Sequence, residues 1–174
     1  SPLYSTRRLF ELASEKEFYL LTALSLFRVI AGIVAAIALA FPISAVCSSV
    51  KTADAVFAPA VTLMKSTPVV SFILIAIFIV DRSLIPTIIT FMMVFPVIYE
   101  NLREGIRSTS RELIEMSKVF GISRYLKIKR IYLPAIKPFF YSALYTSVGL
   151  AIKAGIAAEV IAYIPLSIGK ELSD

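Results

Sequence analysis

Long apolar segments alternate with short polar ones along this chain. Residues 29–46 contain no charged side chain, and they continue an apolar pattern that begins at Leu20 and is interrupted only by Arg28. A helix that crosses a membrane needs about 20 mainly apolar residues, so this segment is long enough. Its alanines and Gly32 are small, which favours close helix packing in lipid. We expect the first membrane helix here.

Three further apolar segments follow. They cover residues 66–80, extended backward through 57–64, then 83–99, and finally 138–169. Helices on the surface of soluble proteins keep one polar face, and these segments have none. Thr67-Pro68 should break or kink the second segment, because proline lacks a backbone N–H and clashes with the preceding turn. The pattern predicts an all-α, polytopic membrane bundle with four membrane helices.

The polar N-terminal stretch has a different character. Leu9, Phe10, Leu12 and Ala13 recur at helical spacing, which predicts a short helix lying at the membrane surface. The order of a signal peptide, basic and then apolar, is missing. The chain begins without Met and stops in a polar stretch. We therefore expect one domain over residues 1–174 that is incomplete at both ends.

Composition removes several classes of function. Apolar residues make up 58% of the chain and charged residues 17%, against roughly 45–50% and about 25% in soluble domains. The chain has no His, which excludes His-based general bases and Ser-His-Asp triads. Its single cysteine, Cys47, allows neither an intrachain disulfide nor a multi-Cys metal site. No phosphate-binding Gly-x-x-x-x-Gly-Lys motif is present. We expect no enzyme activity and no metal or cofactor in this chain.

The positive charge is concentrated in one place. Residues 103–137 hold nine basic and three acidic residues, which accounts for the whole net charge of +6. A basic patch can bind nucleic acid, but this one lies between two apolar segments, so the positive-inside rule makes it a cytoplasmic loop. Residues 47–51 would then be cytoplasmic and residues 81–82 external. A free Cys47 agrees with the reducing cytoplasm. Nucleic acid is not an expected partner.

The basic loop has helical signals of its own. Thr109 and Glu112 have the spacing of a capping box at a helix start, and Gly121 follows where a helix would end. Ser123 can cap a second short helix, which Pro134 would stop. Two interpretations remain open for this helix–turn–helix. It is either an amphipathic pair attracted to anionic lipid or a docking element for a cytoplasmic partner.

The spacing of residues within the loop resembles a family signature. Glu115-Met116-Ser117, three residues, Gly121, nine residues, Ile131, one residue and Leu133-Pro134 is similar to the Glu-Ala-Ala loop of binding-protein-dependent ABC importer permeases. Met116 and Ser117 stand where that pattern has alanine. Further segments resemble the nitrate, sulfonate and taurine branch of the family: 25–32, 65–68, 95–97, 157–159 and 168–169. Asp81-Arg82 departs from relatives, which usually have glycine there.

The resemblance implies a fold, a function and partners. It implies a type I ABC importer permease in the inner or plasma membrane of a prokaryote, with residues 103–137 as the cytoplasmic coupling loop. Its partners would be two ATPase subunits, which hold ATP and Mg, a second permease subunit in a homodimer, and an extracytoplasmic substrate-binding protein. The cargo would be a small solute of the nitrate, sulfonate, taurine or vitamin-precursor type. The implied ATPase-coupling residues are Glu115, Met116, Ser117, Phe120, Gly121, Ile131, Leu133 and Pro134.

Charged residues inside the apolar segments are candidates for a translocation path. Lys153 and Glu159 are six residues apart, about 240° around a helix, so they should not pair with each other. For Glu159 a structural hydrogen bond within the bundle is the alternative, and Lys153 and Arg28 can extend to the membrane surface. Tyr141 and Tyr145 are further path candidates, with packing as the alternative. Two other functions stay open: an ion-coupled secondary transporter using Glu159 and Lys153, and a membrane scaffold whose loop binds lipid.

Overall fold

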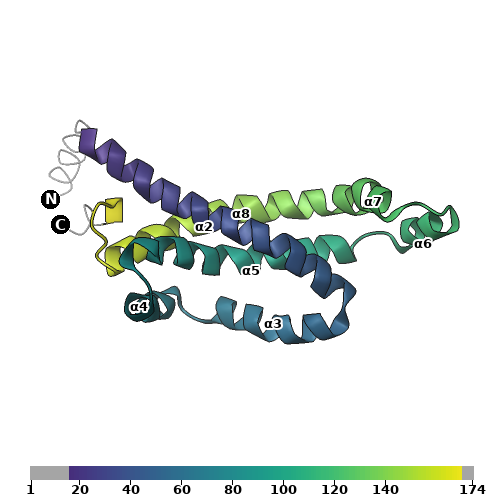
Figure 1. The fold of residues 1–174 in the computed structure, drawn as a ribbon, viewed down its shortest axis with the longest axis horizontal. Helices are drawn as coiled ribbons and strands as arrows, with labels where there is room; N and C mark the ends of the chain where they lie inside the picture. The colour runs from purple at the N-terminus through teal and green to yellow at the C-terminus, as the bar shows by residue number, and fades with distance from the viewer. Residues whose placement is uncertain (1–15, 170–174) are drawn as a thin grey trace.

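Helices account for nearly all of the computed structural model, which describes residues 16–169 (Figure 1). No strand occurs in that range. The predicted all-α class is therefore confirmed. The helices in chain order are α2 (Lys16–Ser49), α3 (Lys51–Ser66), α4 (Val69–Ile79), the short η1 (Arg82–Leu84), α5 (Ile85–Arg107), α6 (Arg111–Val119), α7 (Arg124–Lys127), the π-turn η2 (Ile128–Tyr132) and α8 (Leu133–Ile161).

Three helical segments are long and apolar enough to cross a membrane. They are Phe18–Ser49, Arg82–Arg107 and Arg124–Ile161. The remaining predicted span is the pair α3 and α4, which is bent by 102° at its break and raises the number to four if it counts as one span. Pro68 caps the start of α4, so the expected break at Thr67-Pro68 is confirmed. The last apolar segment was expected to run to residue 169, but α8 ends at Ile161 and a turn follows.

The centre of the bundle is α5, which packs along both α2 and α8, while these two helices contact each other less. The buried side chains of α5 include Ile89, Val94, Ile98 and Leu102, each fully enclosed. The facing side of α2 has small residues at four-residue spacing: Gly32, Ala36 and Ala40. A Cβ atom on Gly32 would lie 2.6 Å from the Thr87 carbonyl oxygen of α5. The small stripe therefore lets the two helix backbones approach closely.

We predict that Gly32→Val destabilises the bundle, because the added side chain has to separate α2 from α5. Overpacking of this kind typically costs about 1–3 kcal/mol. The measurement is the unfolding midpoint of the purified protein in detergent. Gly149→Val is the matched control, since no atom lies within 4 Å of a Cβ built on Gly149. Equal midpoints for the two variants would contradict the close packing of α2 on α5.

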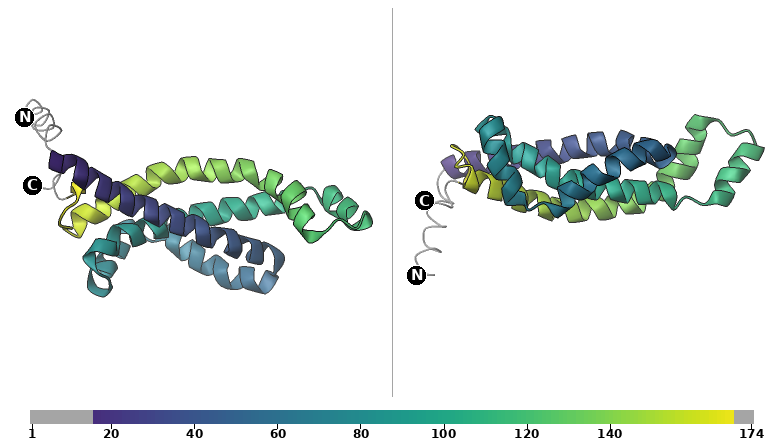
Figure 2. Two further views of the ribbon diagram at one scale, coloured as in Figure 1. Left: turned by 45° about the horizontal axis from the view of Figure 1, so that its top comes forward. Right: turned by 90° about the horizontal axis from the view of Figure 1, so that it is seen from below.

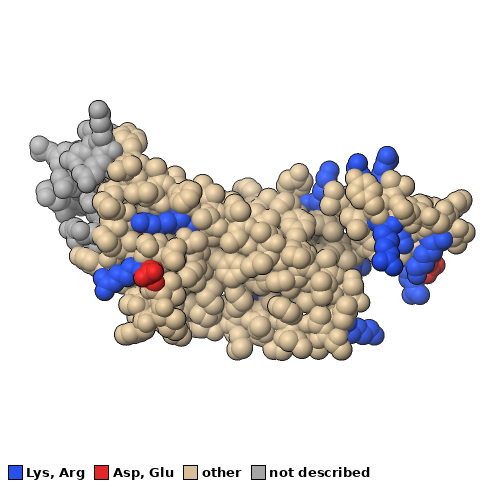
Figure 3. Space-filling view, viewed as in Figure 1, with Lys and Arg blue, Asp and Glu red and all other residues tan. Residues whose placement is uncertain are grey.

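The connections divide between the two ends of the bundle. The α2–α3 connection and the segment that carries α6 and α7 lie at one end, and η1, with Asp81 before it, lies at the other (Figure 1). Residues 47–51 and 81–82 are thus at opposite ends, as the predicted topology requires. Figure 2 shows α6 standing out beyond the bundle in both views. On the face drawn in Figure 3, most Lys and Arg side chains lie toward the end with α6 and α7. The helix predicted within residues 1–15 lies outside the described residues.

Candidate functional site

The helix α6 begins with a side-chain cap at Ser110. The Ser110 hydroxyl accepts a hydrogen bond from the Leu113 N–H at 3.4 Å, which satisfies one of the unpaired donors at the start of the helix. The predicted capping box started one residue earlier, at Thr109. That residue is buried, and its hydroxyl donates to the Gly105 carbonyl at 3.3 Å instead. The cap is therefore shifted by one position from the prediction.

The end of α6 is fixed by Gly121. This glycine has a φ of +62°, a left-handed conformation that glycine adopts without a Cβ penalty. The Gly121 N–H donates to the Lys118 carbonyl at 3.1 Å, and the Ile122 N–H donates to the Ser117 carbonyl at 2.9 Å. These two bonds form a Schellman motif, which satisfies carbonyl groups at the end of a helix. The predicted C-terminal cap at Gly121 is confirmed.

Most side chains of α6 point away from the bundle. Val119 is 83% exposed and Phe120, directly after the helix, is 75% exposed; Leu113 and Met116 are also exposed. The exception is Ser117, which is fully buried and whose hydroxyl donates to the Ile114 carbonyl at 2.6 Å. Exposed apolar side chains on a helix that projects from the bundle form a surface available for a partner.

Glu115 belongs to the exposed part of α6. Its carboxylate accepts a hydrogen bond from Arg111, one turn earlier, at 3.0 Å, and both side chains are largely solvent-exposed. Such a pair contributes about 0.3–0.5 kcal/mol to a helix. The structure therefore shows Glu115 paired with Arg111 on the same helix. It shows no hydrogen bond between Glu115 and the turn at Gly121.

The second half of the loop is continuous with α8. Ser123 caps α7 by accepting from the Leu126 N–H at 3.4 Å, as predicted. The helix was expected to stop at Pro134, but α7, η2 and α8 follow one another without a break. Pro134 is the second residue after the π-helical turn η2, where the α-helical i→i−4 hydrogen-bond pattern is already interrupted. Ile131 is buried, whereas Leu133 and Pro134 are exposed. Of the predicted loop 103–137, residues 103–107 belong to α5 and 133–137 to α8.

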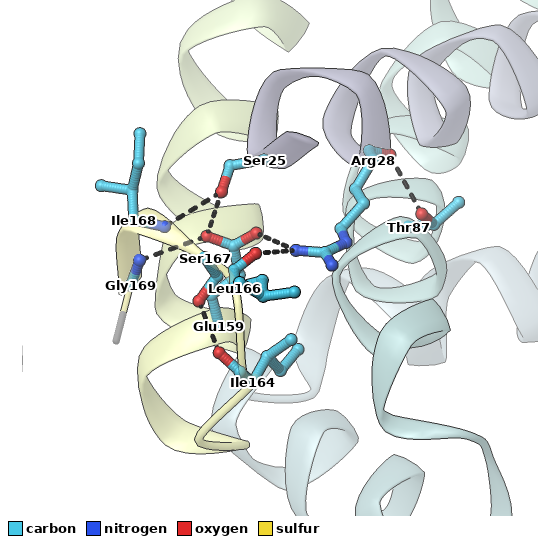
Figure 4. A network of polar contacts seen from close by, with 9 residues as sticks. All are labelled: Ser25, Arg28, Thr87, Glu159, Ile164, Leu166, Ser167, Ile168 and Gly169. Carbon is cyan, nitrogen blue, oxygen red and sulfur yellow. Dashed lines mark hydrogen bonds and ion pairs between the residues drawn. The ribbon is translucent and has the colours of Figure 1, made fainter. Parts of the chain in front are cut away.

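At the opposite end of the bundle, Glu159 is the centre of a buried polar network (Figure 4). Its carboxylate accepts a hydrogen bond from the Ser25 hydroxyl at 2.8 Å and one from the Gly169 N–H at 3.3 Å. Arg28 forms an ion pair with the other carboxylate oxygen at 3.3 Å. The Glu159 side chain is 1% exposed and that of Arg28 16%. Arg28 was expected to extend to the membrane surface, but the structure turns it inward to this carboxylate.

The network also holds the turn that follows α8. Arg28 donates to the Leu166 carbonyl at 3.3 Å, and the Ile168 N–H donates to the Ser25 hydroxyl at 3.2 Å (Figure 4). Tyr163 and Leu166 have φ values of 51° and 57°, which are unfavourable for residues with a Cβ. The surrounding hydrogen bonds therefore stabilise a turn that its own residues do not favour.

Four residues of the network belong to the segments that resemble the permease family, but the sequence did not indicate that they contact one another. Ser25 and Arg28 come from the segment at residues 25–32, and Glu159 and Gly169 come from two segments more than 130 residues later. A Cβ on Gly169 would lie 2.4 Å from the Glu159 Cβ, so this close contact requires glycine. The family resemblance singled out these segments in the sequence. That their residues contact one another follows only from the packing of α2 against α8.

Comparison with known proteins identifies the family of this chain. A sequence profile described as "Binding-protein-dependent transport system inner membrane component" matches residues 28–170. The match covers most of the chain, including α6 and Glu159. The chain belongs to this family. A search of curated proteins gave no significant match. The protein is thus the permease component of an ABC transporter, a multi-pass inner-membrane protein.

The permease brings together only part of the predicted translocation path. Tyr141, Tyr145 and Lys153 all belong to the exposed side of α8, although they spread over about a third of its circumference. Lys153 has no hydrogen bond or ion pair to any residue between 16 and 169. Glu159 is buried against α2 instead, in the network with Arg28. The predicted separation of Lys153 from Glu159 is confirmed.

Metal chemistry has no support in the described part of the permease. No group of three His, Cys, Asp or Glu side chains comes together there. The family is one of transporters and not of enzymes.

Proposed function

We propose that this permease forms the path for a small solute and is driven by two cytoplasmic ATPases that dock on α6. The observation that carries the proposal is the helix itself. It is capped at both ends, projects beyond the bundle, and exposes Met116, Val119 and Phe120. An apolar helix face of this kind fits a groove on a partner. The basic residues around it support a cytoplasmic position for α6.

The rigid continuity from α7 into α8 supports a mechanical role for the loop. Force applied to α6 reaches α7 through the short Gly121 turn, and α7 continues through η2 into the 29-residue α8. A displacement at the ATPase is therefore passed to a helix that crosses the membrane. A disordered linker between α6 and α8 would absorb that displacement.

For the path itself we propose the face of α8 with Tyr141, Tyr145 and Lys153. This face is open in the single chain, so a second permease subunit can complete a passage around it, as in a homodimer. A fixed positive charge at Lys153 favours anionic solutes. Such a charge suits cargo of the nitrate, sulfonate or taurine type, delivered by an extracytoplasmic binding protein.

An ion-coupled secondary transporter using Glu159 and Lys153 is the weaker candidate. Its proton-binding group would need access to water, and the Glu159 carboxylate is enclosed and neutralised by Arg28. The two side chains also occupy different sides of α8. Nothing in that mechanism uses α6.

Phe120→Asp is the variant that tests docking, because it places a charge where an apolar groove is expected. We expect the ATPase recovered with affinity-purified permease to fall at least fivefold, with the permease yield unchanged. Glu112→Gln, an exposed polar change on the same helix, serves as the control and should retain the ATPase. Full ATPase recovery with Phe120→Asp, or uptake that survives ATP depletion and collapses with the proton gradient, would contradict the proposal.

A further inference from the structure

A cavity lies where the membrane helices meet the loop segment. It has a volume of about 610 Å³, within the range of small-molecule sites. Its walls come from the last two turns of α2, the end of α5, the start of α8 and Ile114 of α6. The spans of α2 and α5 end at Ser49 and Arg107, two of the lining residues, so the cavity lies near one end of the membrane-spanning part of the bundle.

The lining combines apolar side chains with a few polar groups. Leu102, Ile106 and Ile136 supply aliphatic surface, together with Phe41. Ser48 also lines the cavity, and its hydroxyl oxygen is buried without a hydrogen-bond partner in the described part of the chain. The lining is therefore mainly apolar, with Arg107 as its charged residue.

The charged residues at the mouth of the cavity indicate the sign of the charge that a ligand there would carry. Arg107 is a lining residue, and its guanidinium pairs with Asp54 at 3.0 Å. Arg103 also pairs with Asp54. Two guanidinium groups share one carboxylate, so one positive charge is left without a partner within this cluster. The Arg107 side chain is 48% exposed and is thus accessible to an anionic group.

We propose that this cavity binds an anionic phospholipid of the adjacent leaflet. Its acyl chain occupies the aliphatic part between α2, α5 and α8. Its phosphate lies at Arg107, the exposed charged residue of the lining. A lipid fits better than a soluble metabolite because the site is mainly apolar and lies where lipids arrive by lateral diffusion. Basic pockets between membrane helices at the cytoplasmic surface recognise lipid headgroups in this way.

The site has a consequence for the loop. Ile114 of α6 is one wall of the cavity, while most other α6 side chains point into solvent. A lipid that fills the cavity packs against Ile114 and steadies α6 relative to the bundle. The binding proposal itself requires only the membrane location, and it does not depend on ATPase docking.

The test is native mass spectrometry of the purified transporter, incubated with an equimolar mixture of dioleoyl phosphatidylglycerol and dioleoyl phosphatidylcholine. We expect the wild type to retain phosphatidylglycerol at least fivefold over phosphatidylcholine. Ala45→Phe places a ring in the cavity, since Ala45 is a lining residue, and should lower the retained phosphatidylglycerol at least fivefold. Ala38→Phe is the matched control. Ala38 is exposed two turns earlier on α2 and lies outside the lining, so retention should stay within twofold of the wild type.

Arg107→Gln gives a readout of headgroup recognition that does not depend on cavity shape. It should abolish the preference for phosphatidylglycerol while leaving some lipid bound. Equal retention of the two lipids by the wild type would overturn the proposal. So would phosphatidylglycerol retention that is unchanged in both Ala45→Phe and Arg107→Gln, or a structure of the assembled transporter in which a protein segment fills the cavity.

Discussion

Glu159→Ala is expected to destabilise the permease by about 3–5 kcal/mol, the usual cost of removing one partner of a buried ion pair. The substitution leaves the Arg28 guanidinium without its carboxylate and removes an acceptor from the Ser25 hydroxyl and the Gly169 N–H. The strained turn at Tyr163 and Leu166 also loses the group that holds it. The measurement is denaturant-induced unfolding of the purified permease in mixed micelles.

The double variant Arg28→Met, Glu159→Ala distinguishes the contribution of the ion pair to stability from the contribution of side-chain packing. Both charges are then absent, so no unpaired charge remains buried, and part of the lost stability should return. If the double variant is as unstable as the sum of the two single variants, the ion pair is not what stabilises this end of the bundle.

Gly121→Val is expected to uncouple ATP hydrolysis from uptake. A residue with a Cβ at this left-handed position costs roughly 1–2 kcal/mol, and a β-branched side chain is among the least suited to it. A strain of this size changes the population of the capped helix by about 5–30-fold. Uptake by proteoliposomes should fall by a similar factor, while ATP hydrolysis continues. The measurement is the number of ATP molecules hydrolysed per solute transported.

Gly121→Asn is the control for that experiment, because asparagine tolerates the left-handed conformation better than other residues with a Cβ. No atom lies within 4 Å of a Cβ at this position, so steric contact plays no part in either variant. Asn should keep most of the coupling. Equal loss of coupling with Asn and Val would show that the backbone conformation of Gly121 is not the cause.

The long helices were predictable because their signals are local. Apolar length located α2, α5 and α8, and Pro68 located the break before α4. Apolar length alone did not locate the end of α8, since residues 162–169 are about as apolar as the helix before them. Their turn depends on a hydrogen bond from the Ile168 N–H to Ser25 and one from Arg28 to the Leu166 carbonyl, and both partners are distant in sequence. Likewise, Pro134 did not end a helix, because it follows the π-helical turn η2, which already departs from the α-helical hydrogen-bond pattern.

In the candidate site, too, local features were predictable from the sequence and contacts between distant residues were not. Gly121 and Ser123 were identified correctly, because a helix cap involves residues only a few positions apart. The partner of Glu159 was not found, because Arg28 lies 131 residues away and each charge alone is compatible with lipid, water or a neighbouring helix. Which side chains of α6 are exposed also depends on the way the helix leaves the bundle, and no local pattern specifies that.

The most direct test of the account is cysteine cross-linking from α6 in the assembled transporter. A Val119→Cys variant, in a Cys47→Ser background, would be treated in membranes with a short bifunctional thiol reagent after cysteines are introduced along the ATPase groove. We expect a cross-link between permease and ATPase whose yield changes when ATP is bound. A Val119→Cys residue that forms no such cross-link, and that is labelled by a membrane-impermeant thiol reagent added outside intact cells, would contradict the account.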